Sequence, residues 1–256
     1  MVGLHDHSLV GREYNAATGA LSVLSIAEGL DIRCLKVRFI QIGRLVFVGN
    51  DYWIKLRGSH VQYSVLSLMM EVKDFKQRIT SYTTGETVRD VLWRTLTLNQ
   101  YSEVLDEPSG FDTGLPNIAV MNSVSVVRRL FDLAFLKPEN LIQEFGKPEI
   151  YKTAVTGFLA LSKTLRGWKL AILSRDLVSM VTVNAEVGDT VAIISGTRVP
   201  YVLRQVPSND GTKLYRLVGE CYVHGVMNGE FLKGATEPEY QEIGIVYCPN
   251  CEVEPS

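Results

Sequence analysis

The sequence has few cysteines, little net charge and no hydrophobic run long enough to cross a membrane. Four cysteines among 256 residues are too few for a disulfide framework, so we expect a reducing, cytoplasmic environment. A net charge of −2 leaves no basic surface for nucleic acid or anionic lipid, and neither is expected as a partner. No apolar run reaches the roughly 20 residues of a bilayer span, and the first residues lack the pattern of a secretory signal.

Motifs for common cofactors and catalytic centres are also missing. The sequence contains no P-loop, no GxGxxG fingerprint, no GxSxG elbow and no metalloprotease spacing. Cys248-Pro-Asn-Cys251 has the spacing of a redox pair or half a zinc site, whereas Cys34 and Cys221 are isolated. We therefore expect neither a metal nor a cofactor, and interpret the two C-terminal cysteines as ordinary thiols.

The order of the segments indicates the fold class. With 46% hydrophobic and 21% charged residues, the chain can bury a sizeable core as one compact domain, residues 1–256. Residues 1–58 are strand-rich, 59–166 helical, 167–248 rich in β-branched residues, and 249–256 form a tail. Strands followed by helices and then strands are typical of an α+β protein. We expect N-terminal strands, a central group of about four to five helices, and a small C-terminal antiparallel β meander or barrel.

Apolar residues recur every three or four positions through the middle of the chain, which is the pattern of amphipathic helices. A helix start is indicated by Thr84, Glu86 and Thr87. Tyr101–Pro116, with two prolines and several acids, is expected to be a long loop. The helical segments expected from this pattern are Val61–Thr80, Thr84–Asn99, Asn117–Leu136, Leu141–Phe145 and Ile150–Leu165.

Alternating residues mark the strands at both ends of this helical part. In the first strand region Val37 and Phe39 face one way against Lys36 and Arg38, and a bulge is expected near Leu35-Lys36. Three β-rich runs near the C-terminus are separated by glycine-containing turns, which favours a meander. Those runs are Thr190–Ser195, Val199–Val206 and Lys213–His224.

The C-terminal runs carry a resemblance to a known family. Residues 188–204 read Gly-Asp-x-Val-x-x-x-x-Gly-x-x-x-Pro-Tyr-Val-Leu-Arg, and residues 215–230 read Tyr-x-Leu-Val-Gly-Glu-x-Tyr-Val-His-Gly-x-Met-x-Gly-Glu. This pattern resembles the C-terminal module of fungal heterokaryon-incompatibility (HET) proteins. Tyr82–Leu96 resembles the middle helical segment of that family, and Tyr14–Gly19 the start of the region after the HET domain.

The resemblance extends over about Tyr14 to Tyr247. It implies the part of a HET protein that follows the HET domain proper. The death-effector domain at the N-terminus of that family, which is distantly related to TIR domains, has no counterpart in this sequence. The resemblance implies a fungal protein, and implies no catalytic residue.

Three polar residues are candidates for catalysis. His224 ends the last β-rich run, and alternation places Tyr222 on the same face of that strand. A histidine can act as a general acid or base near neutral pH. Together with Arg94, these residues could donate a hydrogen bond to a substrate carbonyl. The alternative is that His224 only fixes the turn before Gly225.

Aromatic residues near the helical segments could line a pocket. Trp53, Trp93 and Tyr101 combine apolar walls with polar tips, which suits an apolar small molecule. The alternative is that they pack in the core.

Two functions follow from these observations. The favoured hypothesis is a stand-alone HET-like enzyme of fungal secondary metabolism, a cofactor-independent cyclase of the Diels–Alderase type acting on an apolar substrate. It rests on the missing effector domain, a start at Met1 and the lack of cofactor motifs. The alternative is a non-catalytic interaction or regulatory module of an allorecognition protein. A homo-oligomer is compatible with either function.

Overall fold

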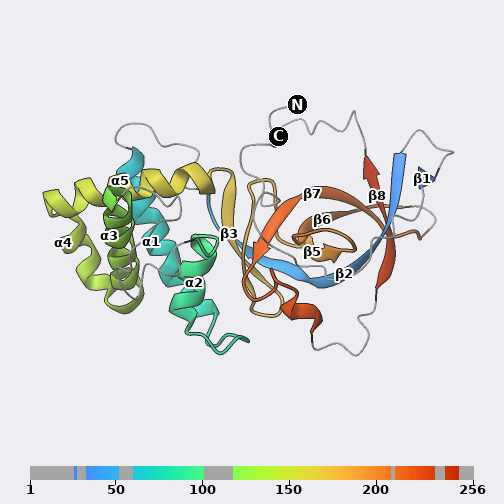
Figure 1. Ribbon diagram of the computed structural model, residues 1–256, viewed down its shortest axis with the longest axis horizontal. Helices are drawn as coiled ribbons and strands as arrows, with labels where there is room; N and C mark the ends of the chain where they lie inside the picture. The colour runs from blue at the N-terminus through green and yellow to red at the C-terminus, as the bar shows by residue number, and fades with distance from the viewer. Residues whose placement is uncertain are drawn as a thin grey trace.

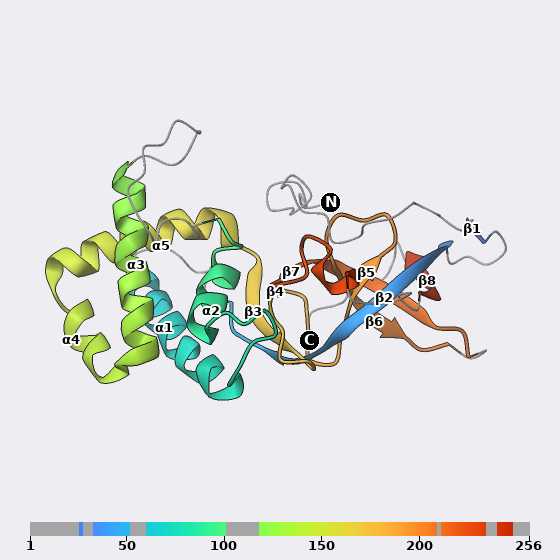
Figure 2. The ribbon, with the colours of Figure 1, turned by 60° about the horizontal axis from the view of Figure 1, so that its bottom comes forward.

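The protein consists of a group of helices beside a β-barrel (Figure 1). The computed structural model describes residues 26–27, 33–51, 60–100, 118–208, 211–233 and 240–247. In both Figure 1 and Figure 2 the helices lie at one end of the molecule and the strands at the other, with α2 between them. This arrangement confirms the expected α+β class.

The barrel is a closed ring of antiparallel strands. Going round the ring, β2 pairs with β3, β3 with β4, β4 with β7, β7 with β6, β6 with β5, and β5 returns to β2. Closure leaves no free edge within the ring, which removes the exposed backbone groups that promote aggregation. The strands are β2 (Arg33–Val48), β3 (Trp168–Leu173), β4 (Val178–Thr182), β5 (Thr190–Ile194), β6 (Tyr201–Val206) and β7 (Leu214–Val223).

Strand β8 (Gln241–Tyr247) bridges β2 and β7 on the side of the barrel away from the helices (Figures 1 and 2). It pairs antiparallel with the first half of β2, from Arg33 to Phe39. It also pairs in parallel with Leu214 and Tyr215 at the start of β7. The short β1 (Ile26–Ala27) pairs with Cys34 and Leu35 of β2 on the edge opposite β8.

The C-terminal meander is confirmed, and the position of the N-terminal bulge is corrected. β5, β6 and β7 are antiparallel neighbours in chain order, as the three β-rich runs predicted. The expected bulge near Leu35-Lys36 is wrong, because β2 pairs with β8 in unbroken register there. The irregularities lie between Gln41 and Gly43 and between Leu45 and Phe47, where β2 changes partner from β5 to β3.

The helices follow the apolar spacing of the sequence closely. Thr87 caps α2, because its side chain accepts a hydrogen bond from the backbone N–H of Asp90. Pro148 lies in the first turn of α5, where its missing N–H costs nothing. The predicted loop Tyr101–Pro116 lies outside the described residues. The helices are α1 (His60–Arg78), α2 (Val88–Leu96), α3 (Ile118–Leu136), α4 (Leu141–Phe145) and α5 (Pro148–Leu165), with a 3-10 turn at Pro138–Asn140.

Two hydrophobic clusters form the core. The larger runs without interruption from the helices, for example Phe75, Trp93 and Phe131, into the barrel strands at Leu170 and Val178. The smaller lies among the strands around β8. Its members are Val37, Phe39, Ala192, Ile194, Leu203, Tyr215 and Ile243. None of the described helices is long and apolar enough to cross a membrane.

Candidate functional site

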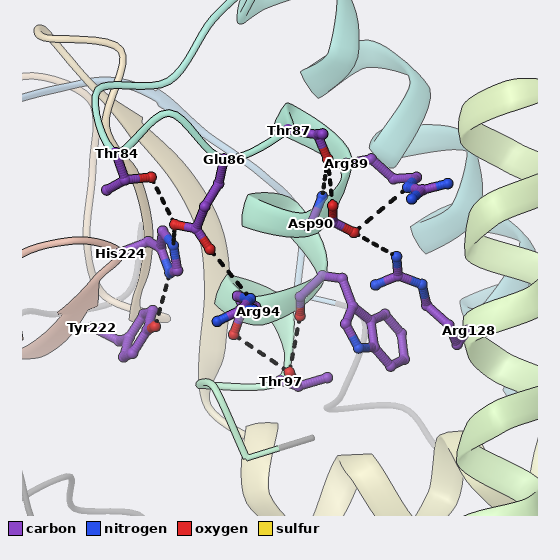
Figure 3. A network of polar contacts seen from close by, with 11 residues as sticks. Thr84, Glu86, Thr87, Arg89, Asp90, Arg94, Thr97, Arg128, Tyr222 and His224 are labelled. Carbon is purple, nitrogen blue, oxygen red and sulfur yellow. Dashed lines mark hydrogen bonds and ion pairs between the residues drawn. The ribbon is translucent and has the colours of Figure 1, made fainter. Parts of the chain in front are cut away.

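A chain of hydrogen bonds joins the end of β7 to the start of α2 (Figure 3). His224 Nε2 is 2.7 Å from Glu86 Oε2, and its Nδ1 is 3.1 Å from the hydroxyl of Tyr222. The Thr84 hydroxyl donates to Glu86 Oε2 at 2.6 Å, and Arg94 Nε lies 3.3 Å from Glu86 Oε1. We call these five residues the His224 network.

The chemistry of the partners fixes the direction of these bonds. A carboxylate only accepts, so Nε2 of His224 carries a proton and donates it to Glu86. In the neutral ring Nδ1 then accepts from the hydroxyl of Tyr222. The order hydroxyl, imidazole, carboxylate is that of a catalytic relay. However, only 5% of His224 and 2% of Tyr222 is exposed, so the hydroxyl at its end does not reach solvent.

The backbone at the end of β7 is held by the segment before α2. The hydroxyl of Tyr82 donates to the carbonyl of His224 at 2.8 Å and accepts the N–H of Val178 at 3.3 Å. Burial raises the pKa of Tyr82 well above its usual range, which keeps the hydroxyl protonated. Gly225 has φ +76°, and a Cβ there would lie 2.8 Å from Cγ2 of Thr84. The close approach of the two segments therefore requires glycine at this position.

Electrostatics favour the ionised form of Glu86. Burial alone would raise its pKa, but hydrogen bonds from Thr84 and His224 and the charges of His224 and Arg94 together lower the pKa below its ordinary value. The carboxylate is 29% exposed. It therefore remains a charged acceptor at neutral pH.

A second polar group lies on the other side of α2 and joins it to α3 (Figure 3). The side chain of Arg128 is 7% exposed and donates to Asp90 at 2.9 Å, while its Nε lies 3.0 Å from Asp132. Its guanidinium also lies over the rings of Trp93 and Phe131, at 5.1 and 5.4 Å. Helix α2 is thus fixed on one side to the barrel and on the other to α3.

The structure brings the three predicted catalytic residues together. His224 and Tyr222 are in direct contact, and Arg94 reaches them through Glu86. Whether they act in catalysis stays a prediction.

Of the predicted substrate-binding residues, Trp93 lies within the part of the chain that the structure describes. Trp93 is 1% exposed and packs against Phe131 in the core, with ring centroids 5.4 Å apart. Trp53, Tyr101 and the pair Cys248 and Cys251 lie outside the described residues. Within the described ranges, no group of three or more histidine, cysteine or acidic residues is placed to hold a metal.

An open groove lies beside the His224 network on the helical side. Its volume is about 750 Å³, and its walls come from the end of α1, the segment before α2, the start of α2 and the end of α3. Ile79, Tyr82 and Phe135 form its buried apolar floor, and Leu136 at its edge is 56% exposed. Glu86 belongs to both the groove and the His224 network.

Sequence reasoning missed Glu86 and Tyr82 as members of the site. Glu86 lies 138 residues before its partner His224, so no local spacing connects them. One signal was available, because a buried histidine beside a tyrosine still needs an acceptor for its second nitrogen. The Gly85-Glu86 pair in the family-like segment before α2 offered that acceptor.

Comparison with known protein families finds a barrel domain in the same part of the chain. Residues 147–242, from α5 to the start of β8, match the Het-6 beta-barrel domain. Heterokaryon incompatibility protein 6, OR allele, from Neurospora crassa is 40% identical over 53 residues, which are 21% of this chain and 8% of that protein. The match therefore spans less than a tenth of that Neurospora protein. No solved structure matches the chain significantly. These findings confirm the resemblance of the C-terminal strands to HET proteins and place a Het-6 β-barrel domain at residues 147–242.

Proposed function

We propose that the protein is a non-catalytic interaction module of a heterokaryon-incompatibility response, in which the barrel and the helices together present a binding surface. The observation that carries this proposal is the burial of His224 and Tyr222 within the His224 network. Both ring nitrogens of His224 are engaged, and the hydroxyl at the end of the relay is buried. A general acid or base must reach the proton that it transfers. A relay whose tyrosine and histidine are buried, with both ring nitrogens engaged, is better suited to holding two parts of a protein together.

The continuous core supports the same proposal. Hydrophobic packing from α1 to the barrel strands and the two polar groups on α2 hold the molecule as a preformed surface. Preformed surfaces bind partners at a lower entropic cost than flexible ones. The name of the Neurospora relative places that protein in heterokaryon incompatibility, and we extend that role to this chain.

Cross-linking in cells followed by mass spectrometry tests the proposal. The tagged chain is expressed in a fungal host, cross-linked and purified, and a parallel sample is analysed by native mass spectrometry. We expect a protein that is cross-linked to the chain and absent with the tag alone, and no bound metabolite. The chain recovered as a free monomer in cells, or with a retained small molecule and no protein, would contradict the proposal.

A cofactor-independent cyclase is the second candidate, and the relay order of Tyr222, His224 and Glu86 favours it. In that case the buried hydroxyl must become accessible to substrate. Tyr222→Phe would then abolish turnover of any metabolite retained by the chain, while leaving the fold unchanged by circular dichroism. For an interaction module, Tyr222→Phe removes the hydrogen bond to His224 and leaves partner binding unchanged.

A further inference from the structure

Two hollows in the surface of the helical part adjoin at Leu136. The first is the groove of about 750 Å³ described above. The second has a volume of about 370 Å³ and lies along α3, between Ser125 and Lys137. Leu136, the last residue of α3, lines both of them and is 56% exposed. An aliphatic side chain exposed between two hollows offers apolar surface that a bound partner would remove from water.

The charged residues around these hollows are mainly basic. Lys76 and Arg89 line the first hollow, and Arg128, Arg129 and Lys137 line the second. The acidic residues that line them are Glu86 and Asp132. Since the whole chain carries a net charge of −2, this basic excess is local.

Part of this charge is already neutralised within the protein. Arg129 lies 2.7 Å from Glu144, and Arg128 is paired with Asp90 and Asp132. Arg89 lies 3.6 Å from Asp90.

The two lysines on either side of Leu136 differ from these arginines. Lys76 donates to the carbonyl of Phe135 at 2.7 Å and lies 4.7 Å from the centroid of its ring. Among the described residues, neither Lys76 nor Lys137 has a carboxylate within 4.0 Å. Two ammonium groups without an acidic partner therefore flank an exposed leucine.

We infer that the Leu136 surface, formed by Lys76, Arg89, Phe135, Leu136 and Lys137, binds a segment of a partner protein in which apolar side chains alternate with carboxylates. This inference rests on the proposed interaction function and adds the place of contact and the chemistry of the partner. The apolar side chains of the segment fill the hollows beside Leu136. Its carboxylates reach the ammonium groups of Lys76 and Lys137.

Binding of defined peptides tests the chemistry. The probe is a fluorescent peptide of alternating leucine and glutamate, and the matched probe carries lysine in place of glutamate. Fluorescence anisotropy with the full chain is expected to show binding of the acidic peptide, at least tenfold weaker binding of the basic peptide, and weakening with added salt because salt screens charge. Equal binding of the two peptides, or no binding of the acidic one, would overturn the inference.

Paired variants test the place. Leu136→Asp is expected to weaken the acidic peptide at least tenfold, or about 1.4 kcal/mol, and Lys137→Glu several-fold. The controls are Ile142→Asp on α4, where the side chain is 73% exposed, and Lys163→Glu at an exposed position of α5. Neither control lines the two hollows, so both should bind as the unchanged protein does. Circular dichroism establishes that each variant is folded. Equal effects of Leu136→Asp and Ile142→Asp would place the binding elsewhere.

Two further measurements separate this inference from the proposed function. In the cross-linking experiment, a partner captured equally by the unchanged chain and by Leu136→Asp leaves the interaction function standing and overturns the Leu136 surface. The absence of any cross-linked partner on the unchanged chain contradicts the function itself. Displacement of the acidic peptide by dodecanoate tests the remaining alternative, in which a small apolar carboxylate binds this surface. If the surface binds dodecanoate and not the acidic peptide, the peptide inference is wrong.

Discussion

The two parts of the barrel differ in what stabilises them. Next to the helices, the strands share one continuous hydrophobic core with α1, α2 and α3. Around β8 the strands have a smaller core of their own, to which no described helix contributes. One part of the barrel therefore depends on the helical region, and the other depends on pairing between strands distant in sequence.

Polar groups show the same contrast. Near the helices, the buried side chains of His224 and Arg128 are each hydrogen-bonded to a carboxylate. Around β8 the ion pair of Arg38 and Glu242 spans 3.9 Å, with 48% and 64% of the side chains exposed. Exposed pairs of this kind contribute little to stability, whereas buried bonded groups cost much when one partner is removed. The comparison indicates that specific polar contacts help to position the helices, whereas strand pairing and a small hydrophobic core position the β8 side.

The largest effect is expected from removing a large side chain from the core that the helices share with the barrel. Trp93→Ala should lower the free energy of unfolding by about 3–5 kcal/mol, since the side chain is fully buried. Hydrogen exchange should then rise in α2, α3 and β4 together. The matched variant is Phe39→Ala, also 1% exposed, which should raise exchange mainly in β2 and β8. If exchange in Trp93→Ala rises in α2 and α3 but not in β4, the helices and the barrel strands beside them are independent.

A smaller effect is expected where the segment before α2 meets β7. Gly225→Ala should destabilise the protein by more than the roughly 1–2 kcal/mol of the left-handed backbone alone, because the new Cβ would also lie 2.8 Å from Thr84. Gly211→Ala is the control, since φ is +77° and nothing lies within 4 Å of its Cβ. Urea unfolding of both variants measures the difference. Equal losses would mean that Thr84 moves aside without cost.

The smallest effect is expected from the charge of Glu86. Its pKa is lowered in the folded protein, so its stabilising contribution is present at neutral pH and is lost as the pH falls below the ordinary value of 4.5. Glu86→Gln should therefore lower the urea midpoint at pH 7 and have a decreasing effect on acidification. Glu242→Gln, at the exposed pair around β8, should change stability by less than about 0.5 kcal/mol at either pH. A loss in Glu86→Gln that persists unchanged in acid would contradict the role of the charge.

Local patterns in the sequence predicted most of the helices and the meander. The spacing of Val65, Leu68, Val72 and Phe75 predicted α1, and all four are buried. Alternation also predicted that Tyr222 and His224 lie on one side of the chain, and they are in contact although β7 ends at Val223 and His224 begins the following turn. These features depend on neighbours within a few residues.

Features that depend on distant partners were missed or misplaced. The irregularities of β2 occur where it changes from one partner strand to another, and those partners come from residues after Trp168. The bond between Glu86 and His224 joins segments 138 residues apart. For Trp93 the sequence left a pocket and the core as alternatives, and its burial depends on α3, which supplies Phe131 and Arg128. The spacing of residues within one sequence does not indicate which distant segments pair.

The pairing of β2 has a consequence for the order of folding. Apart from the two-residue β1, its partners are β3, β5 and β8, so the strand from Arg33 to Val48 is synthesised long before any of them. The helices α1 to α5 precede β3 in the sequence and contact one another, so they can form before β2 gains these partners. During synthesis β2 therefore remains without these partners until β3 and the strands that follow it have been made.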